Sequence, residues 1–328
     1  MLNYKSIRIL TWFISLTLAT WLISDLPFNT IFETIVSLTT VQWFYWLSVN
    51  LVIILIFVWR WQALTKGLKL KLHFFNLLLL RQAGQSISFI TPGPQFGGEP
   101  LQIFFLWKKY LISPSNAVVA VTVDRVFELW TNFSVLLIGI MVLFYTQEEL
   151  ANWFSIALLL GLIILFLSLS IWLLINQRET IENAINKWSK KWLKSKYLAV
   201  TKFRSDKVTD SLNSLLTNKT ALSAAVLLCI SGWSLTFFEL YLVLSFFNIN
   251  LGISHFILLI VAMRLAFLLP LPGGIGTLEA SVFWSFTALA LPITSAAALL
   301  ALIRFRDIVV IGGGFICLRL LQSKTVLV

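Results

Sequence analysis

Residues 86–100 read Ser-Ile-Ser-Phe-Ile-Thr-Pro-Gly-Pro-Gln-Phe-Gly-Gly-Glu-Pro, a stretch dense in helix breakers within apolar surroundings. Proline removes a backbone donor and clashes with the preceding turn, and glycine disfavours the helix, so no regular helix runs through this stretch. A second break, Pro-Leu-Pro-Gly-Gly-Ile-Gly, occupies residues 270–276. Each break predicts two short helices joined by a turn, and these two hairpins decide the fold.

The composition predicts that this chain lies in a lipid bilayer. Of its 328 residues, 59% are hydrophobic and 12% are charged, and the mean hydropathy is +0.89. A soluble protein of this length has too little polar surface to cover so many apolar side chains. These values exclude a soluble enzyme, a disordered chain and a fibrous repeat. They predict a single all-α polytopic membrane domain over residues 1–328.

The cysteines and histidines predict neither a disulfide framework nor a metal site. Cys229 and Cys317 both lie in apolar runs, and the chain has only two histidines, His73 and His255. Too few ligands are present for a metal cluster. We therefore expect no cofactor.

Six apolar runs are long enough to cross a bilayer as helices. They cover about residues 9–24, 43–59, 114–145, 153–175, 221–247 and 293–318. The first run follows Lys5 and Arg8, and no small-residue cleavage site comes after it. We therefore predict a retained span rather than a signal peptide.

The basic residues predict the orientation. Four loops contain no Lys or Arg, namely 25–42, 146–152, 248–254 and 291–295. The positive-inside rule puts these loops outside and every basic group in the cytoplasm, including the group that starts at Arg60. Both termini are then cytoplasmic. The loop 176–220 carries ten basic residues, and it is either an amphipathic helix on an anionic leaflet or a plain positive-inside loop.

The same rule defines the two hairpins. The segment 72–107 starts and ends beside cytoplasmic lysines, and its arms are too short for two crossings. The segment 255–290 starts and ends outside, so it enters from the opposite face. Irregular backbone at membrane depth is tolerated where protein or a watery cavity satisfies it. We therefore predict two oppositely oriented re-entrant hairpins beside about six full transmembrane helices.

The two halves of the chain repeat the same residues in the same order. Six landmarks of the first half correspond to six of the second: His73, Arg81, Pro92-Gly93, Glu99, Arg125 and Glu128, and His255, Arg264, Pro272-Gly273, Glu279, Arg304 and Asp307. This order predicts an inverted repeat of about residues 43–145 and 221–322. Inverted repeats with broken helices are typical of transporters, whose substrate site lies near the midplane. A duplicated scaffold that transports nothing is the alternative.

Ionisable residues within the apolar segments are the candidate chemistry. There are six acids and five arginines, and each costs about 2.5–3.5 kcal/mol on insertion scales, which favours a function. Arginine binds phosphate oxygens bidentately, and amides at a helix start suit an anion. We therefore expect Arg125 and Arg304 to bind the phosphate of the substrate, helped by the glycine-rich tips of the hairpins. The predicted substrate-binding residues are Arg81, Gly97, Gly98, Glu99, Arg125, Glu128, Arg264, Gly273, Gly274, Glu279, Arg304 and Asp307. The alternative is that these residues have only a structural role. The ion pairs would then join helices, and Glu99 and Glu279 would cap the N-termini of the short helices.

Three strings carry a resemblance to a known family: Thr91–Pro100, Asp124-Arg-Val-Phe-Glu-Leu129 and Pro270–Glu279. They resemble the lysylphosphatidylglycerol synthase transmembrane-region family, also called flippase-like membrane proteins, over nearly the whole chain. In its two-part members, the resemblance implies a region that flips aminoacylated phosphatidylglycerol made by a separate soluble domain. The chain ends at Val328 without that domain. We therefore expect a stand-alone member that moves lipids and transfers no aminoacyl group. The resemblance leaves the lipid open, because stand-alone members serve other polar lipids, including polyprenyl-linked sugars.

The sequence favours translocation of a polar, phosphate-bearing lipid across the cytoplasmic (inner) membrane. Expected partners are lipids with anionic or polyprenyl-linked headgroups and a lipid-synthesising enzyme, and not nucleic acid, despite the net charge of +11. Two other classes stay open. One is an intramembrane lipid-modifying enzyme, which we do not expect because no HExxH motif or nucleophile elbow is present. The other is a non-transporting partner of a lipid-modification complex.

Overall fold

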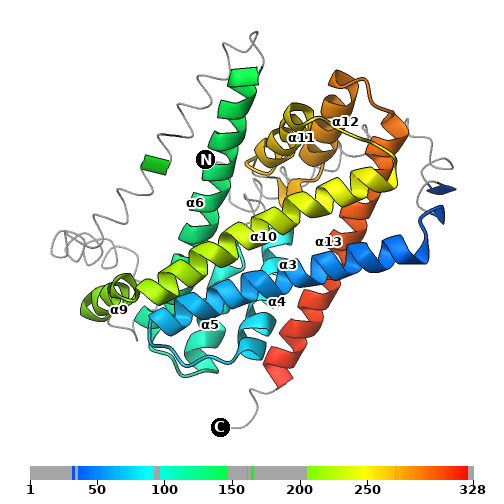
Figure 1. Ribbon diagram of the computed structural model, residues 1–328. Helices are drawn as coiled ribbons and strands as arrows, with labels where there is room; N and C mark the ends of the chain where they lie inside the picture. Colours follow the sequence, from blue (N-terminus) through cyan, green and yellow to red (C-terminus); the bar gives the residue numbers. More distant parts are fainter. Residues whose placement is uncertain are drawn as a thin grey trace, which may run out of the picture.

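The computed structural model describes residues 32–33, 36–91, 97–146, 161, 164–165, 205–269 and 271–323, and its secondary structure in these residues is helical (Figure 1). The predicted spans at about 9–24 and 153–175 lie wholly or mostly outside the described residues. So do the hairpin tip at 92–96 and the loop residues 176–204. The all-α membrane class is confirmed for the described part.

Two series of four helices follow each other along the described chain. The first contains α3 (Thr40–Gly67), α4 (Phe74–Ile90), α5 (Glu99–Lys108) and α6 (Pro114–Thr146). The second contains α10 (Lys219–Phe246), α11 (Ile253–Ala266), α12 (Thr277–Ala288) and α13 (Ile293–Ser323), with a 3-10 turn at Pro272–Gly274. The lengths run 28, 17, 10 and 33 residues in the first series and 28, 14, 12 and 31 in the second. The short helix α9 (Ser205–Thr217) precedes α10 and forms the last part of the predicted basic loop.

Local sequence signals set the helix ends. Thr39 and Gln42 form a capping box at the start of α3, with the Gln42 amide donating to Thr39 Oγ1 at 3.3 Å. Asn218 caps α10 by accepting from the amide of Ala221 at 3.0 Å. Pro114 opens α6, where its missing N–H is not needed.

Three of the described helices, α3, α6 and α10, are long and apolar enough to cross a membrane. The hairpin helices are shorter. At 1.5 Å per residue, α4 extends about 25 Å and α5 about 15 Å, less than a hydrocarbon core of about 30 Å.

The helices of the two series pack across each other. Helices α3 and α10 lie side by side, α4 packs along α13, and α11 packs along α6 (Figure 1). The first helix of each hairpin therefore contacts the last long helix of the other series. Gly314 permits α13 to cross α4 closely, because a Cβ there would overlap Ser86 Oγ and the carbonyl of Gln82.

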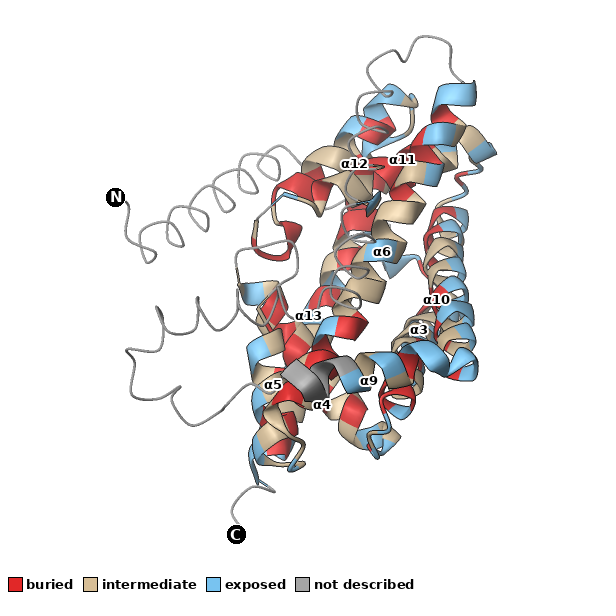
Figure 2. Ribbon diagram, turned by 90° about the vertical axis from the view of Figure 1, so that its left-hand side faces the viewer, coloured by how far each residue is buried: buried red, intermediate tan, exposed pale blue. Residues whose placement is uncertain are grey.

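Apolar side chains form a core at each end of the bundle. One core joins α3, α4, α5 and α6 around Trp61, Leu77 and Leu106. The other joins the opposite ends of α3 and α10 with α11, α12 and α13, around Trp46 and Phe286. Exposed and part-exposed residues alternate along the outer faces of α3 and α10 (Figure 2). Large exposed hydrophobics such as Phe44, Leu51 and Leu227 suit contact with lipid.

Candidate functional site

Six ionisable side chains of α3, α4, α5 and α6 form what we call the first ion-pair cluster. Its members are Arg60, Arg81, Glu99, Asp124, Arg125 and Glu128. Arg60 is fully buried, and its Nη2 lies 2.7 Å from Asp124 and 3.4 Å from Glu128. Arg81 joins the same two acids, at 2.8 Å from Asp124 and 2.5 Å from Glu128. A buried charge persists only with such partners, because an unpaired one is costly to desolvate.

Arg125 fastens the start of α5 to α6. Its Nε lies 2.5 Å from Glu99 and its Nη1 lies 2.6 Å from Glu128, one helical turn along α6. The other carboxylate oxygen of Glu99 accepts the amide of Gly97 at 2.7 Å. Gly97 has φ 140°, so the chain turns there into α5.

The second series contains the same arrangement. Arg304 on α13 binds Glu279 of α12 at 2.7 Å and Asp307, one turn along, at 3.0 Å. Glu279 in turn accepts the amide of Gly276 at 2.7 Å, as Glu99 does for Gly97. Arg304 also donates to the carbonyls of Gly273 and Gly274 at 3.0 and 3.3 Å. Each short helix is thus fastened to the following long helix by an arginine between two acids.

Glu239 and Arg306 extend these contacts into a second ion-pair cluster, with Glu279, Arg304 and Asp307. Arg306 lies 3.5 Å from Glu239 and 3.6 Å from Asp307, which is looser than the pairs of the first cluster. Glu239 accepts a 2.8 Å hydrogen bond from the indole of Trp46 on α3. This bond joins α3 to α10 at the level of the charged side chains.

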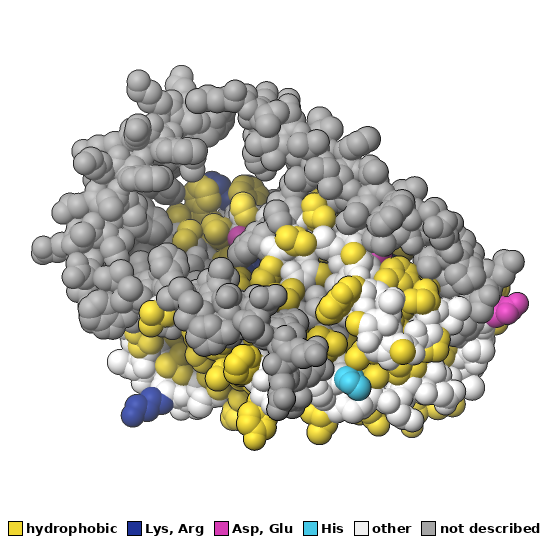
Figure 3. Space-filling view, turned by 90° about the horizontal axis from the view of Figure 1, so that it is seen from above, with side chains coloured by type: hydrophobic (Ala, Val, Ile, Leu, Met, Phe, Trp, Pro, Cys, Tyr) yellow, Lys and Arg dark blue, Asp and Glu magenta, His cyan; other side chains and the backbone are white. Residues whose placement is uncertain are grey.

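A cavity of about 620 Å³ lies between the two clusters. Helices α3, α4, α6, α10, α11 and α13 contribute its walls, so both series enclose it. Most of the lining side chains are apolar, and charged and amide side chains lie among them, as suits a site for an amphipathic ligand. Seen from above, basic and acidic atoms appear within a hollow of a mostly hydrophobic or uncharged described surface (Figure 3).

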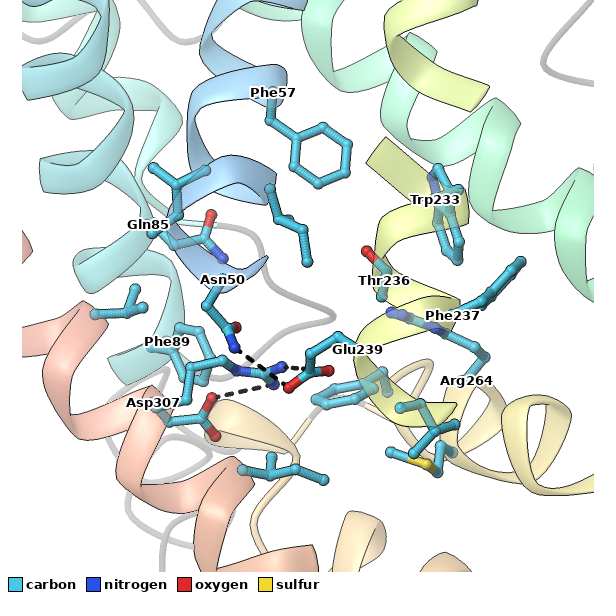
Figure 4. Close-up of a pocket in the computed structure, with 18 of the residues that line it drawn as sticks. Asn50, Phe57, Gln85, Phe89, Trp233, Thr236, Phe237, Glu239, Arg264 and Asp307 are labelled. Carbon is cyan, nitrogen blue, oxygen red and sulfur yellow. Dashed lines mark hydrogen bonds and ion pairs between the residues drawn. The ribbon is translucent and has the colours of Figure 1, made fainter. Parts of the chain in front are cut away.

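Arg264 on α11 differs from every other charged residue of the cavity wall. No carboxylate of the described residues makes an ion pair with it. Its guanidinium instead lies over the indole of Trp233, 4.5 Å from the ring centroid. Figure 4 shows Arg264 and Trp233 on one side of the cavity, with Asp307 on the other. The wall therefore presents a cation that no carboxylate of the described residues contacts, and such a group suits an anionic ligand.

The family of the chain follows from its sequence profile. The profile described as lysylphosphatidylglycerol synthase TM region matches residues 8–313. The chain belongs to this family. The match includes both ion-pair clusters and the cavity wall, so the site lies wholly within the lysylphosphatidylglycerol synthase TM region. No curated protein matches the chain.

The structure brings five of the twelve predicted substrate-binding residues to the cavity wall. They are Arg81, Arg125, Glu128, Arg264 and Asp307. Membership of the family does not assign their roles, so binding of substrate by these residues stays a prediction.

The other seven predicted residues do not line this cavity. Every guanidinium nitrogen of Arg304 already binds Glu279, Asp307 or a hairpin carbonyl, so the expected pairing of Arg304 with a phosphate has no donor to use. The expected amide donors at the tips are also engaged. The amide of Gly97 binds Glu99, that of Gly98 binds Ser88 Oγ at 3.0 Å, and that of Gly274 binds the Leu271 carbonyl. Glu99, Glu279 and Gly273 are held within the same two fastenings.

Sequence reasoning missed Arg60 as a site residue. Its position beside Lys66 and Lys69 assigned it to a cytoplasmic loop, but α3 continues to Gly67 and buries it completely. With Arg60 included, the ionisable residues assigned to the apolar segments are six acids and six arginines. Asp124 could have indicated this residue. It lies in an apolar run and has no basic residue three or four positions away, so it needed a partner from another helix.

The described residues offer no resident metal site. No group of three His, Cys, Asp or Glu side chains in this part of the chain is arranged to hold a metal ion. The cavity wall supplies guanidinium groups, the side-chain amides of Gln82, Gln85 and Asn132, and apolar surface.

Proposed function

We propose that this protein moves a polar, phosphate-bearing lipid between the leaflets of the cytoplasmic membrane. The headgroup occupies the cavity between the two ion-pair clusters while the acyl tails remain in the bilayer. The observation that carries the proposal is Arg264, a cation in the cavity wall without an acidic partner among the described residues. Membership of a membrane family named for a lipid synthase agrees with lipid as the ligand.

The proposed architecture is an inverted repeat of about six spans and two re-entrant hairpins, with both termini cytoplasmic. Three features support it: the similar helix lengths, the exchange of packing partners between the series, and the corresponding positions of the two arginines that each join a short helix to a long one. Because each fastening makes one unit of a short and a long helix, the two units are suited to rock about the cavity. Such rocking gives alternating access.

Arg264 and Arg125 are the proposed phosphate ligands. No carboxylate of the described residues forms an ion pair with Arg264, and Arg125 lines the wall from α6, in the other series. A guanidinium holds two phosphate oxygens through parallel hydrogen bonds, which are stronger than neutral ones because both partners are charged. We propose Arg264 in place of Arg304, since the latter has no unbonded donor.

Transfer of labelled lipids in liposomes tests this proposal. The purified protein is reconstituted, lipids carrying a label on one acyl tail are added, and a membrane-impermeant quencher reports the leaflet that each label occupies. Loss of one charge-assisted hydrogen bond removes about 1.5–3 kcal/mol, so Arg264→Gln is expected to slow transfer by about 10- to 150-fold. Arg319→Gln on α13 is the matched control, because Arg319 is exposed and lies outside the cavity wall.

The outcomes separate the three functional classes. Transfer that Arg264→Gln slows by about tenfold or more, and that Arg319→Gln leaves at the native rate, supports the flippase. Normal transfer by folded Arg264→Gln contradicts it. Lipids are recovered after the assay and examined by mass spectrometry, since a changed headgroup supports a lipid-modifying enzyme instead. A non-transporting partner moves no lipid and tolerates neutral replacement of its paired charges.

A further inference from the structure

The charges of the cavity wall select the sign of a ligand. Four arginines and three acids line it, which leaves one net positive charge: Arg81, Arg125, Arg264 and Arg306, with Glu128, Glu239 and Asp307. Each acid already has at least one arginine partner. Glu128 binds three, Glu239 binds Arg306, and Asp307 binds two. A ligand that carries an ammonium group would have to compete with a guanidinium for each of these carboxylates.

Aromatic faces are the other common partners of an ammonium group. Two of the seven aromatic rings that line the wall already face a guanidinium group. Trp233 faces Arg264, and Phe57 faces Arg60 at 5.3 Å and Arg81 at 5.5 Å. The positive guanidinium groups beside these rings repel a second cation.

Uncharged hydrogen-bonding groups of the wall, by contrast, are available to a ligand. The side-chain amides of Gln82, Gln85 and Asn132 line the cavity, are partly exposed to it, and bond to no other described residue. Figure 4 shows Gln85 beside Asn50, on the wall across from Arg264. Each amide offers donors and an acceptor, which is the pattern that hydroxyl groups satisfy in both directions.

We infer that the headgroup bound here is a phosphate esterified to an uncharged, hydroxyl-bearing group, and not one that carries an ammonium group. The phosphate binds Arg264, and the hydroxyls bind the amides of Gln82, Gln85 and Asn132. This inference rests on the proposed function and names its substrate class. It separates this chain from the aminoacylated lipid in the name of its family, because a lysyl group adds ammonium charge.

The test uses three tail-labelled lipids with identical tails in the liposome assay. Phosphatidylglycerol carries hydroxyls, phosphatidylethanolamine carries an ammonium group, and phosphatidic acid carries neither. We expect the native protein to move phosphatidylglycerol at least tenfold faster than phosphatidylethanolamine. Since one neutral hydrogen bond changes an equilibrium by about fivefold, the double variant Gln85→Leu with Asn132→Leu is expected to slow phosphatidylglycerol by tenfold or more. Its rate for phosphatidic acid is expected to stay unchanged.

Gln62→Leu is the matched control, because Gln62 is a part-buried amide of α3 outside the cavity wall. It is expected to leave all three rates unchanged. Equal rates for phosphatidylethanolamine and phosphatidylglycerol overturn the inference and leave the proposed function standing. The same holds if the double variant moves phosphatidylglycerol normally, or slows phosphatidic acid equally. Failure of the native protein to move any of the lipids contradicts the proposed function itself.

Discussion

Replacing Arg60 by methionine removes the charge at the centre of the first ion-pair cluster. Arg60 is fully buried, and its guanidinium lies 2.7 Å from Asp124 and 3.4 Å from Glu128. Its loss leaves these two acids with too few partners in a low-dielectric interior. Breaking a buried pair from one side costs about 3–5 kcal/mol. At about 2 °C of Tm per kcal/mol for a chain of this size, Arg60→Met lowers Tm by about 6–10 °C.

Thermal unfolding of the purified protein in detergent measures this shift. Asp124→Leu is expected to destabilise the protein too, because it leaves Arg60 and Arg81 short of an acid. The double variant is expected to lose less than the sum of the single losses, since the two residues are directly coupled. Arg319→Met controls for loss of an exposed charge and changes Tm by about 1 °C. The reasoning is refuted if Arg60→Met melts within 2 °C of the native protein or if the two losses add.

Two further predictions concern close packing and the second cluster. Gly314→Ala is expected to destabilise the protein by about 1–3 kcal/mol, because the new Cβ overlaps the backbone of α4, whereas Gly313→Ala meets open space and leaves Tm equal or higher. Thermal melts of both variants decide this, and equal shifts contradict the crossing of α4 and α13. Glu279→Gln is expected to lower Tm by more than 4 °C, because it weakens the fastening of α12 through Arg304. Arg264→Gln leaves no carboxylate unpaired and is expected to keep Tm within about 2 °C; the reverse order of these two shifts would show that Arg264 is structural.

Local features of the fold were accessible from the sequence. Prolines and glycines predicted the breaks between α4 and α5 and between α11 and α12, and hydropathy predicted α3, α6 and α10. Ion pairs between residues one helical turn apart were also accessible, because helix geometry fixes that spacing. Arg125 with Glu128 and Arg304 with Asp307 form such pairs, at 2.6 and 3.0 Å.

Contacts between distant residues were not accessible in the same way. Arg60 and Asp124 are far apart in sequence, and only the crossing of α3 with α6 brings them together. The sequence assigned the phosphate to Arg125 and Arg304, and named Arg264 only as one of the substrate-binding residues. The difference between Arg304 and Arg264 depends on how each helix is rotated, since Arg304 faces the carbonyls of Gly273 and Gly274 while Arg264 faces Trp233. Hydrophobic patterns leave this rotation open in a helix that is apolar on all sides.

The central claim is that Arg264 holds the phosphate of a lipid in the cavity, and native mass spectrometry tests it most directly. The protein is transferred from membranes into detergent, released in the gas phase, and the mass of each retained lipid is recorded. The account predicts a phospholipid adduct on the native protein and on Arg319→Gln, and loss of that adduct from Arg264→Gln. Equal adducts on Arg264→Gln and the native protein would contradict the account.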